Sequence, residues 1–133
     1  MTDDDLIALA RSAAARAYAP YSNFRVGCAI ESVDGSVVTG ANMENACYRL
    51  GICAEQSALT AAQHAFGLDK VARIAVSGGD DATVCTPCGG CRQRIREFAT
   101  PQTRIHVCGP EGLRRTFTCE ELLPESFGPE NLG

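Results

Sequence analysis

The sequence predicts an α/β fold in three layers, a five-strand mixed sheet flanked by helices. Short apolar runs bounded by turn residues recur along the chain and are typical of strands, whereas longer segments between them have apolar residues at helical spacing. Two connections, at Asp34-Gly35 and at residues 109–112, are so short that the strands on either side must pair antiparallel.

The first half of the chain predicts a helix, a strand pair and a second helix. Thr2 or Asp3 caps a first helix, in which apolar residues follow helical spacing until Pro20 stops it. Strands at 26–32 and 37–41 follow, and a loop over 42–52 leads to a helix at 53–66. Gly67 is well placed as the C-terminal cap of that helix.

The second half predicts three strands and two helices. A buried strand at 71–77 and a loop at 78–83 precede a helix at 88–98, which Pro87 introduces. Strands at 104–108 and 113–118 come next. Thr118 and Glu121 have the spacing of a capping box for a short helix at 120–123, and the tail after Pro124 is expected to be irregular.

Length and charge restrict the class of protein. With 133 residues, the chain is expected to form a single domain over 1–133. A formal net charge of −4 and a pI near 5.1 disfavour a nucleic-acid polymer as partner. The N-terminus is acidic rather than basic and no apolar run is long enough to cross a bilayer, so we expect a cytoplasmic protein with no membrane partner.

Eight cysteines are many for so short a chain. In a reducing compartment they favour metal binding over a disulfide framework. Three of them fall in the motifs described next. The other five are expected to be small buried hydrophobic residues, namely Cys28, Cys47, Cys85, Cys108 and Cys119.

Two motifs carry the candidate chemistry, Cys53-Ala54-Glu55 and Pro87-Cys88-Gly89-Gly90-Cys91. Together they supply three thiolate ligands and one carboxylate, which fits a catalytic zinc site with an open fourth position. Both stand at predicted helix N-termini, where the helix dipole favours thiolates. Cys-x-x-Cys alone also occurs in redox pairs and structural zinc sites, and a first-turn Glu is often only a capping residue, but the two motifs in combination favour catalysis.

At these motifs the chain resembles the short-chain, homotetrameric, zinc-dependent cytidine deaminases. The resemblance extends from residues 20–27, through 42–48 and both cysteine motifs, to residues 121–129. It implies one zinc ion per chain, held by Cys53, Cys88 and Cys91. The implied reaction is the hydrolysis of cytidine and 2′-deoxycytidine to uridine and 2′-deoxyuridine plus ammonia, as in pyrimidine salvage, with Glu55 transferring the protons.

The resemblance also implies the nucleoside contacts. Asn42 and Glu44 match residues that bind the ribose, Phe24 matches a residue beside the base, and Tyr48 and Phe127 match aromatic residues given to a neighbouring subunit's pocket. A homo-oligomer with shared active sites is therefore implied, and the family pattern is a tetramer. The complete implied set is Phe24, Asn42, Met43, Glu44, Ala46, Tyr48, Ala54 and Phe127.

One residue departs from the family pattern. Many relatives place Arg directly after Cys-Ala-Glu, where its charge can bond to the thiolates, but this chain has Gln56. We expect both Gln56 and Arg92 to lie beside the metal ligands. Arg92, which follows Cys91 directly, is expected to supply part of the missing positive charge.

Two other functions fit parts of the pattern. One is a deaminase of modified cytosine nucleosides. The other is a non-catalytic zinc module in which a fourth ligand such as Cys85 closes the site. Glu55 and the 42–48 loop argue against the second, because a structural zinc site requires neither.

Overall fold

The structure is a computed structural model that describes residues 1–79 and 83–133. A five-strand sheet has the strand order β2-β1-β3-β4-β5, with β3 and β4 parallel and every other neighbouring pair antiparallel. The elements in chain order are α1 (Asp3–Ala14), β1 (Val26–Ser32), β2 (Val37–Ala41), the 3₁₀ turn η1 (Tyr48–Leu50), α2 (Ala54–Phe66), β3 (Val71–Gly78), α3 (Gly89–Phe98), β4 (Arg104–Gly109), β5 (Gly112–Phe117), α4 (Cys119–Leu122) and the 3₁₀ turn η2 (Pro129–Asn131). The predicted three-layer α/β fold is confirmed.

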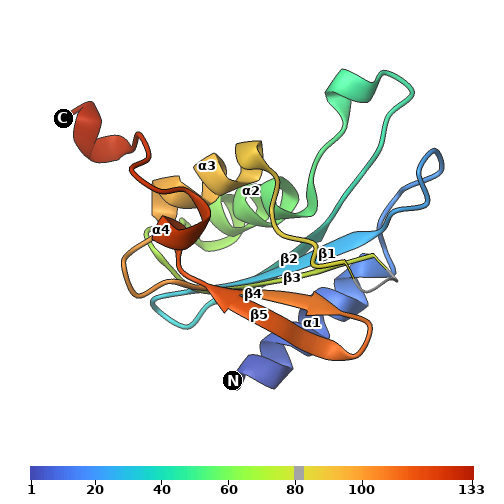
Figure 1. The fold of residues 1–133 in the computed structure, drawn as a ribbon, viewed down its shortest axis with the longest axis horizontal. Helices are drawn as coiled ribbons and strands as arrows, with labels where there is room; N and C mark the ends of the chain where they lie inside the picture. Colours follow the sequence, from blue (N-terminus) through green and yellow to red (C-terminus); the bar gives the residue numbers. More distant parts are fainter. Residues whose placement is uncertain (80–82) are drawn as a thin grey trace.

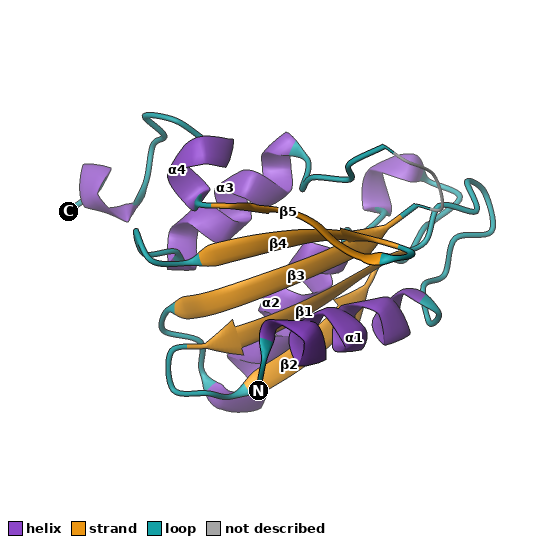
Figure 2. Cartoon of the chain, turned by 60° about the horizontal axis from the view of Figure 1, so that its bottom comes forward, coloured by secondary structure: helices purple, strands orange, loops and turns teal. Residues whose placement is uncertain are grey.

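Helices cover both faces of the sheet. Figures 1 and 2 show α1 on one face and α2 and α3 on the other. Side chains alternate along each strand, so Ile74 and Val76 of β3 pack towards α2 and α3, while Ala75 between them packs towards α1. The central strands β1, β3 and β4 are thus mostly buried, whereas the edge strands β2 and β5 contain no fully buried residue. Among the described residues, no helix is both long enough and apolar enough to span a bilayer.

Small residues allow the helices to approach the sheet closely. A Cβ on Gly27 would lie 2.0 Å from the carbonyl oxygen of Ala10 in α1, and one on Gly40 would lie 2.5 Å from the backbone nitrogen of Ala58 in α2. These two glycines therefore set how closely α1 and α2 approach the sheet, and α2 begins at the candidate site.

The predicted helix starts and turns agree with the structure. Thr2 caps α1 and Thr118 caps α4, each in a capping box. Gly67 ends α2 in the left-handed conformation, with a φ of 71°. Of the loop expected over 78–83, residues 80–82 lie outside the described residues, and Gly78 belongs to β3.

Three stretches differ from the prediction. The first helix ends at Ala14 rather than at Pro20. Beyond it, Arg25 donates to the carbonyl oxygens of Ala15 and Ala17 (3.3 and 2.9 Å), which ties this stretch to the start of β1. The loop over 42–52 and the C-terminal tail were expected to be irregular, but each contains a 3₁₀ turn.

An ion-pair network joins α1 to the sheet. Arg73 of β3 donates to both carboxylate oxygens of Glu31 in β1 (2.7 and 2.8 Å) and to Asp3 Oδ1 (2.8 Å). Buried His106 of β4 also lies 3.1 Å from Asp3 Oδ1. The N-terminal end of α1 is therefore held to two strands by charge-assisted bonds.

Arg73→Gln should lower the free energy of unfolding by about 1–2 kcal/mol at neutral pH, because Glu31 and Asp3 lose a cation at a partly exposed site. Arg73 lowers the pKa of Glu31 through its hydrogen bond and its charge. A carboxylate with a lowered folded-state pKa stabilises the fold above its unfolded-state pKa, and this contribution is lost as pH falls through the folded-state value.

The difference in the free energy of unfolding between wild type and Arg73→Gln should therefore become smaller as the pH falls below about 4.3. Urea unfolding at pH 7 and pH 3.5 measures this. Arg16→Gln makes the same charge change at an exposed position and is the control. An equal loss in both variants, or a loss for Arg73→Gln that does not depend on pH, would contradict the assignment.

Candidate functional site

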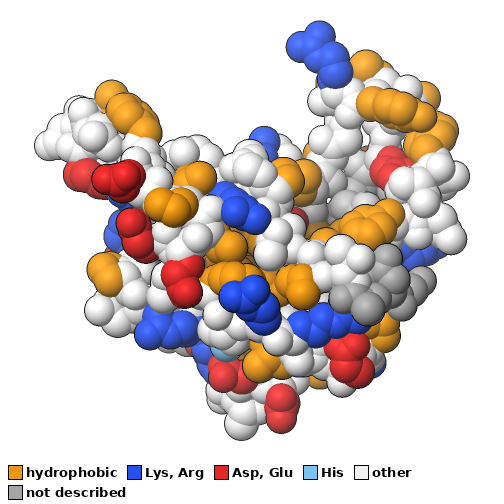
Figure 3. All heavy atoms as spheres, viewed as in Figure 1, with side chains coloured by type: hydrophobic (Ala, Val, Ile, Leu, Met, Phe, Trp, Pro, Cys, Tyr) orange, Lys and Arg blue, Asp and Glu red, His pale blue; other side chains and the backbone are white. Residues whose placement is uncertain are grey.

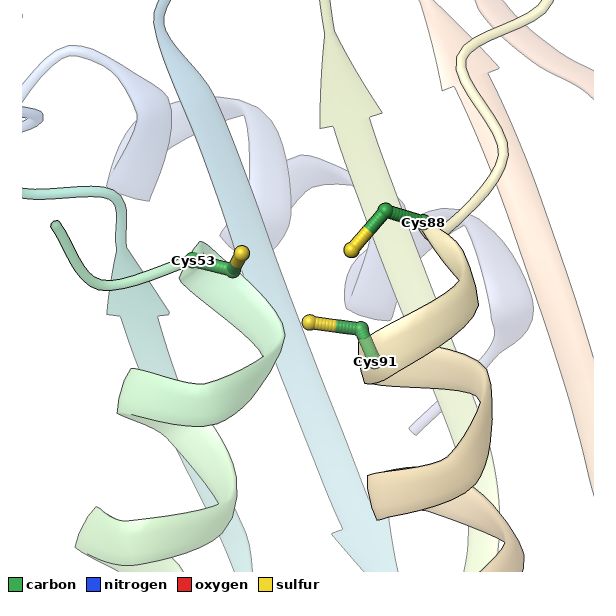
Figure 4. A group of neighbouring side chains, drawn as sticks. All are labelled: Cys53, Cys88 and Cys91. Atoms are coloured by element: carbon green, nitrogen blue, oxygen red, sulfur yellow. The ribbon is translucent and has the colours of Figure 1, made fainter. Parts of the chain in front are cut away.

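The three cysteines of the two motifs meet between two helix N-termini. Cys53 is the N-cap residue of α2 and Cys88 that of α3, while Cys91 lies in the first turn of α3. Their sulfur atoms all lie within 4.8 Å of one another. Figure 4 shows the three side chains pointing towards a common centre. The spacing in sequence thus becomes a three-thiol cluster in space.

The pKa values of these thiols differ. Cys88 has a lowered pKa, chiefly because the backbone N–H of Cys91 donates to its sulfur. Burial raises the pKa of Cys53, and it raises that of Cys91 further, with the nearby charge of Glu55 adding to the effect in both cases. Of these three thiols, only Cys88 has the lowered pKa that is expected at a helix N-terminus. At Cys53 and Cys91 burial outweighs that effect and the pKa is raised.

This donor set fits zinc. Three sulfur atoms that converge on one point, two of them with raised pKa values, are held together as thiolates most readily by a soft divalent cation. Within the described residues the group contains three ligands, and Cys85 is not one of them. A structural site closed by Cys85 is therefore not supported.

Glu55 lies beside the thiols in the first turn of α2. It is 5% exposed, and burial raises its pKa, whereas the positive charge of Arg94 acts in the opposite direction. Its charge also affects the pKa values of Cys53, Cys91 and the fully buried Cys28 of β1. A buried carboxyl group with a raised pKa, next to a metal-ligand set, is suited to taking up and releasing a proton.

A cleft of about 390 Å³ opens onto this cluster. The structure brings most of the predicted substrate residues into its lining, together with Glu55 and two of the thiols. The predicted residues in this lining are Phe24, Asn42, Met43, Glu44, Tyr48, Cys53, Ala54, Glu55 and Cys88. The lining residues that belong to the segment between β2 and α2 include Asn42, Met43, Glu44, Tyr48 and Gly51. Figure 1 shows this segment projecting from the body of the chain.

Asn42 and Glu44 are oriented by bonds to residues 21–26, the segment before β1 and the first residue of that strand. Asn42 accepts a bond from the backbone N–H of Val26 (2.8 Å) and donates to the carbonyl oxygen of Phe24 (2.9 Å). Glu44 accepts from the backbone N–H of Tyr21 (2.9 Å) and from the Ser22 hydroxyl, which lowers its pKa. Both side chains are therefore oriented beside the cleft before any ligand binds.

Two predicted substrate residues do not line the cleft of a single chain. Ala46 is exposed on the projecting segment. Phe127 is 56% exposed on the C-terminal tail, where its carbonyl oxygen accepts a bond from Gln93 (2.9 Å). Figure 1 shows this tail extending from the body on the opposite side from the projecting segment.

One of the two residues expected beside the metal ligands, Arg92, needs correction. Arg92 does not reach the thiols, because its guanidinium donates to the carbonyl oxygens of Pro87 and Leu122 and to Thr86 Oγ1 (2.7, 2.8 and 2.9 Å). Gln56 lines a groove between α2 and α3, and Arg94 lines the same groove. Arg94 contacts a thiol instead, with Nη1 at 3.8 Å from Cys91 Sγ.

Sequence reasoning missed several residues of the site. Val26, Gly51, Ile52, Cys85 and Thr86 complete the lining of the cleft. Thr86 could have been found from its place directly before Pro87-Cys88. Arg94 could have been found from its i, i+3 spacing to Cys91, which puts both on one face of the helix.

The other cysteines agree only partly with the expectation that they are buried. Cys28, Cys108 and Cys119 are buried. Cys47 is exposed on the projecting segment, so that prediction was wrong, and Cys85 is half-buried at the cleft. Among the described residues, the cysteines form no disulfide bond.

The fold and the site, a three-cysteine group that could hold a metal ion and a buried glutamate on a helix-flanked mixed sheet, are those of the zinc-binding deaminase class. The family profile described as "Cytidine and deoxycytidylate deaminase zinc-binding region" matches residues 1–107. The chain therefore belongs to the cytidine and deoxycytidylate deaminase family.

Similar proteins include a cytidine deaminase from Halalkalibacterium halodurans, 42% identical over 116 residues, which covers 87% of this chain and 86% of the relative. A cytidine deaminase from Sporosarcina psychrophila is 36% identical over 132 residues, which covers 99% of this chain and 96% of the relative. The crystal structure of cytidine deaminase from Burkholderia pseudomallei superposes with a TM-score of 0.88 at 42% identity, covering 96% of this chain and 100% of that one.

Proposed function

We propose that this chain is a zinc-dependent cytidine deaminase that hydrolyses cytidine and 2′-deoxycytidine to uridine and 2′-deoxyuridine plus ammonia, in pyrimidine salvage. One observation carries the proposal: the three-cysteine cluster and buried Glu55 lie together at the cleft of a deaminase-family fold. Relatives similar over nearly the whole chain are named cytidine deaminases, which supports one such domain over residues 1–133.

Cys53, Cys88 and Cys91 would hold one zinc ion, which would supply a Lewis acid and acidify a water molecule at the open fourth position. Glu55 moves the protons. Its carboxylate takes one proton from the attacking water and passes it to ring N3, then takes the second proton from the hydroxyl formed on C4 and passes it to the departing amine. A C4–O bond forms, the C4–N bond breaks and ammonia leaves. The buried position of Glu55 supports this role, because a raised pKa lets the carboxyl group hold the proton between steps.

The remaining lining of the cleft would bind the nucleoside. The backbone N–H of Ala54 stands at the first position of α2, where it has no partner within the helix and can donate to the pyrimidine. Phe24 would contact the base, and Asn42 and Glu44 the ribose hydroxyls. The Ser22 and Tyr21 bonds that lower the pKa of Glu44 keep it ionised, which suits a hydroxyl donor better than a phosphate.

Loss of the ultraviolet absorbance of cytidine on addition of the zinc-loaded protein tests the function. Deoxycytidine is run in parallel, and both reactions should stop when a chelator removes the metal. Uridine and ammonia should appear in equal amounts. A protein that binds one zinc ion per chain yet converts neither nucleoside would contradict the proposal.

We also infer a homotetramer in which neighbouring chains complete each site. The projecting segment exposes Met43, Tyr48 and Leu50, at 57%, 80% and 64%. Figure 3 shows hydrophobic side chains gathered on this segment, which stands away from the body of the chain. The exposed ring of Phe127 likewise has room to enter a neighbouring chain's pocket.

Phe127→Ala should raise KM for cytidine about 2- to 10-fold, which corresponds to the 0.5–1.5 kcal/mol of an aromatic contact, with little change in kcat or folding. Light scattering shows whether the assembly is kept. Leu132→Ala, on the same tail and 82% exposed, is the control and should leave KM unchanged. An unchanged KM in a Phe127→Ala variant that stays oligomeric would exclude this role.

A further inference from the structure

Arg94 is the cationic side chain that reaches the metal-ligand cluster from α3. It follows Cys91 by three residues, so both lie on one face of the helix, and its Nη1 lies 3.8 Å from Cys91 Sγ. The guanidinium also lies over the start of the helix, because a Cβ on Gly90 would be 3.1 Å from the same nitrogen. Arg94 therefore packs against the turn that carries two of the three ligands.

The ligand set needs such a cation. Three thiolates around one divalent ion leave one negative charge in excess, and the nearby carboxylate of Glu55 adds to it. Gln56 contributes no charge, and Arg92 is bonded to three oxygen atoms away from the thiols. A cation on a ligand sulfur offsets the excess charge and fixes the direction of that ligand.

We propose that Arg94 is a positioning residue of the zinc site, which holds the Cys91 thiolate and balances the charge of the three-cysteine set from α3. This inference rests on the proposed zinc site. Gln56 and Arg94 line the same groove between α2 and α3. The structure thus places the positive charge on α3, opposite the α2 position where many relatives carry their arginine.

Zinc affinity tests this role without any turnover measurement. Competition with a chromophoric chelator should show that Arg94→Gln binds zinc about 10- to 100-fold more weakly than wild type, the usual cost of losing a residue that orients a metal ligand. Arg94→Lys should recover part of the loss, because it keeps the charge but not the planar fork. The charge-transfer bands of the cobalt(II)-substituted protein report the thiolates directly and should shift in Arg94→Gln.

A second-site rescue separates charge balance from simple packing. Gln56→Arg should restore zinc affinity in the Arg94→Gln background, since the new guanidinium would extend from α2 into the same groove. In the wild-type background Gln56→Arg should change affinity little, because Arg94 already supplies the cation. The two substitutions should therefore be strongly non-additive.

Arg104→Gln is the matched control. It removes one positive charge beyond the other end of α3, where Arg104 bonds to loop carbonyl oxygens, and it should leave zinc affinity unchanged. Unchanged affinity and cobalt bands in Arg94→Gln would overturn the proposal. So would an equal gain from Gln56→Arg in both backgrounds. A wild-type protein that binds zinc but deaminates no nucleoside would refute the proposed function and leave this test intact.

Discussion

Glu55→Gln should keep one zinc ion per chain and lower kcat for cytidine by about a hundredfold to ten-thousandfold, the usual contribution of general acid–base catalysis. Glutamine has nearly the size of glutamate, so the buried pocket at the start of α2 stays filled. Its amide cannot accept a proton from water or deliver one to ring N3. Metal analysis and steady-state kinetics on the same preparation measure both halves of this prediction.

Two comparisons sharpen this test. Glu120→Gln makes the same chemical change at an exposed position of α4 and should keep wild-type turnover. Glu55→Asp keeps the carboxylate but withdraws it by one methylene, so its activity should lie between those of wild type and Glu55→Gln. If Glu55→Gln turned over cytidine at the wild-type rate with its zinc in place, the proton-transfer role would be wrong.

The fold was predictable because its signals are local. The Asp34-Gly35 turn determines the β1–β2 pair, and the capping boxes at Thr2 and Thr118 determine where α1 and α4 begin. The C-terminal end of α1 was not predictable from the same signals. It depends on Arg25, whose guanidinium lies outside the helix and donates hydrogen bonds to the carbonyl oxygens of Ala15 and Ala17.

The candidate site likewise has a part that local sequence predicts, the three cysteines, and a part that it does not, the directions of the arginines. The three cysteines come together because each one stands at or near a helix N-terminus, a position that can be read from the sequence. The direction of an arginine depends on partners that are distant in sequence. Arg92 bonds to Leu122, which α4 brings back to the start of α3, and this leaves Arg94 to face Cys91.

The orientation of the residues expected to bind the ribose also depends on contacts beyond the motifs. Asn42 and Glu44 bond to residues 21–26, so the resemblance identified these side chains but not the bonds that orient them. Ser22 contacts both Glu44 and Phe24. Its hydroxyl donates to the Glu44 carboxylate and accepts from the backbone N–H of Phe24 (3.0 Å). The segment before β1 thereby couples the residue expected beside the base to the one expected at the ribose.

Cys91→Ser should weaken zinc binding by more than about a hundredfold, beyond the range for residues that only orient a ligand. Serine replaces sulfur with an oxygen that does not ionise readily near neutral pH, so the site keeps two thiolates. Cys91 is fully buried between α3 and the sheet, where no water can easily take its place as a ligand. Competition with a chromophoric chelator measures the affinity.

The same variant should also lose the rise in melting temperature that zinc gives the wild-type protein, since a ligand that binds the folded state alone stabilises it by mass action.

Two cysteine variants serve as comparisons. Cys108→Ala removes a buried thiol on the α1 face of the sheet and should keep zinc affinity. Cys85→Ser removes the half-buried thiol of the cleft that lies outside the three-ligand group, and it should also keep zinc. Zinc lost from Cys85→Ser as fully as from Cys91→Ser would make Cys85 a fourth ligand, which would close the site and leave no position for the attacking water.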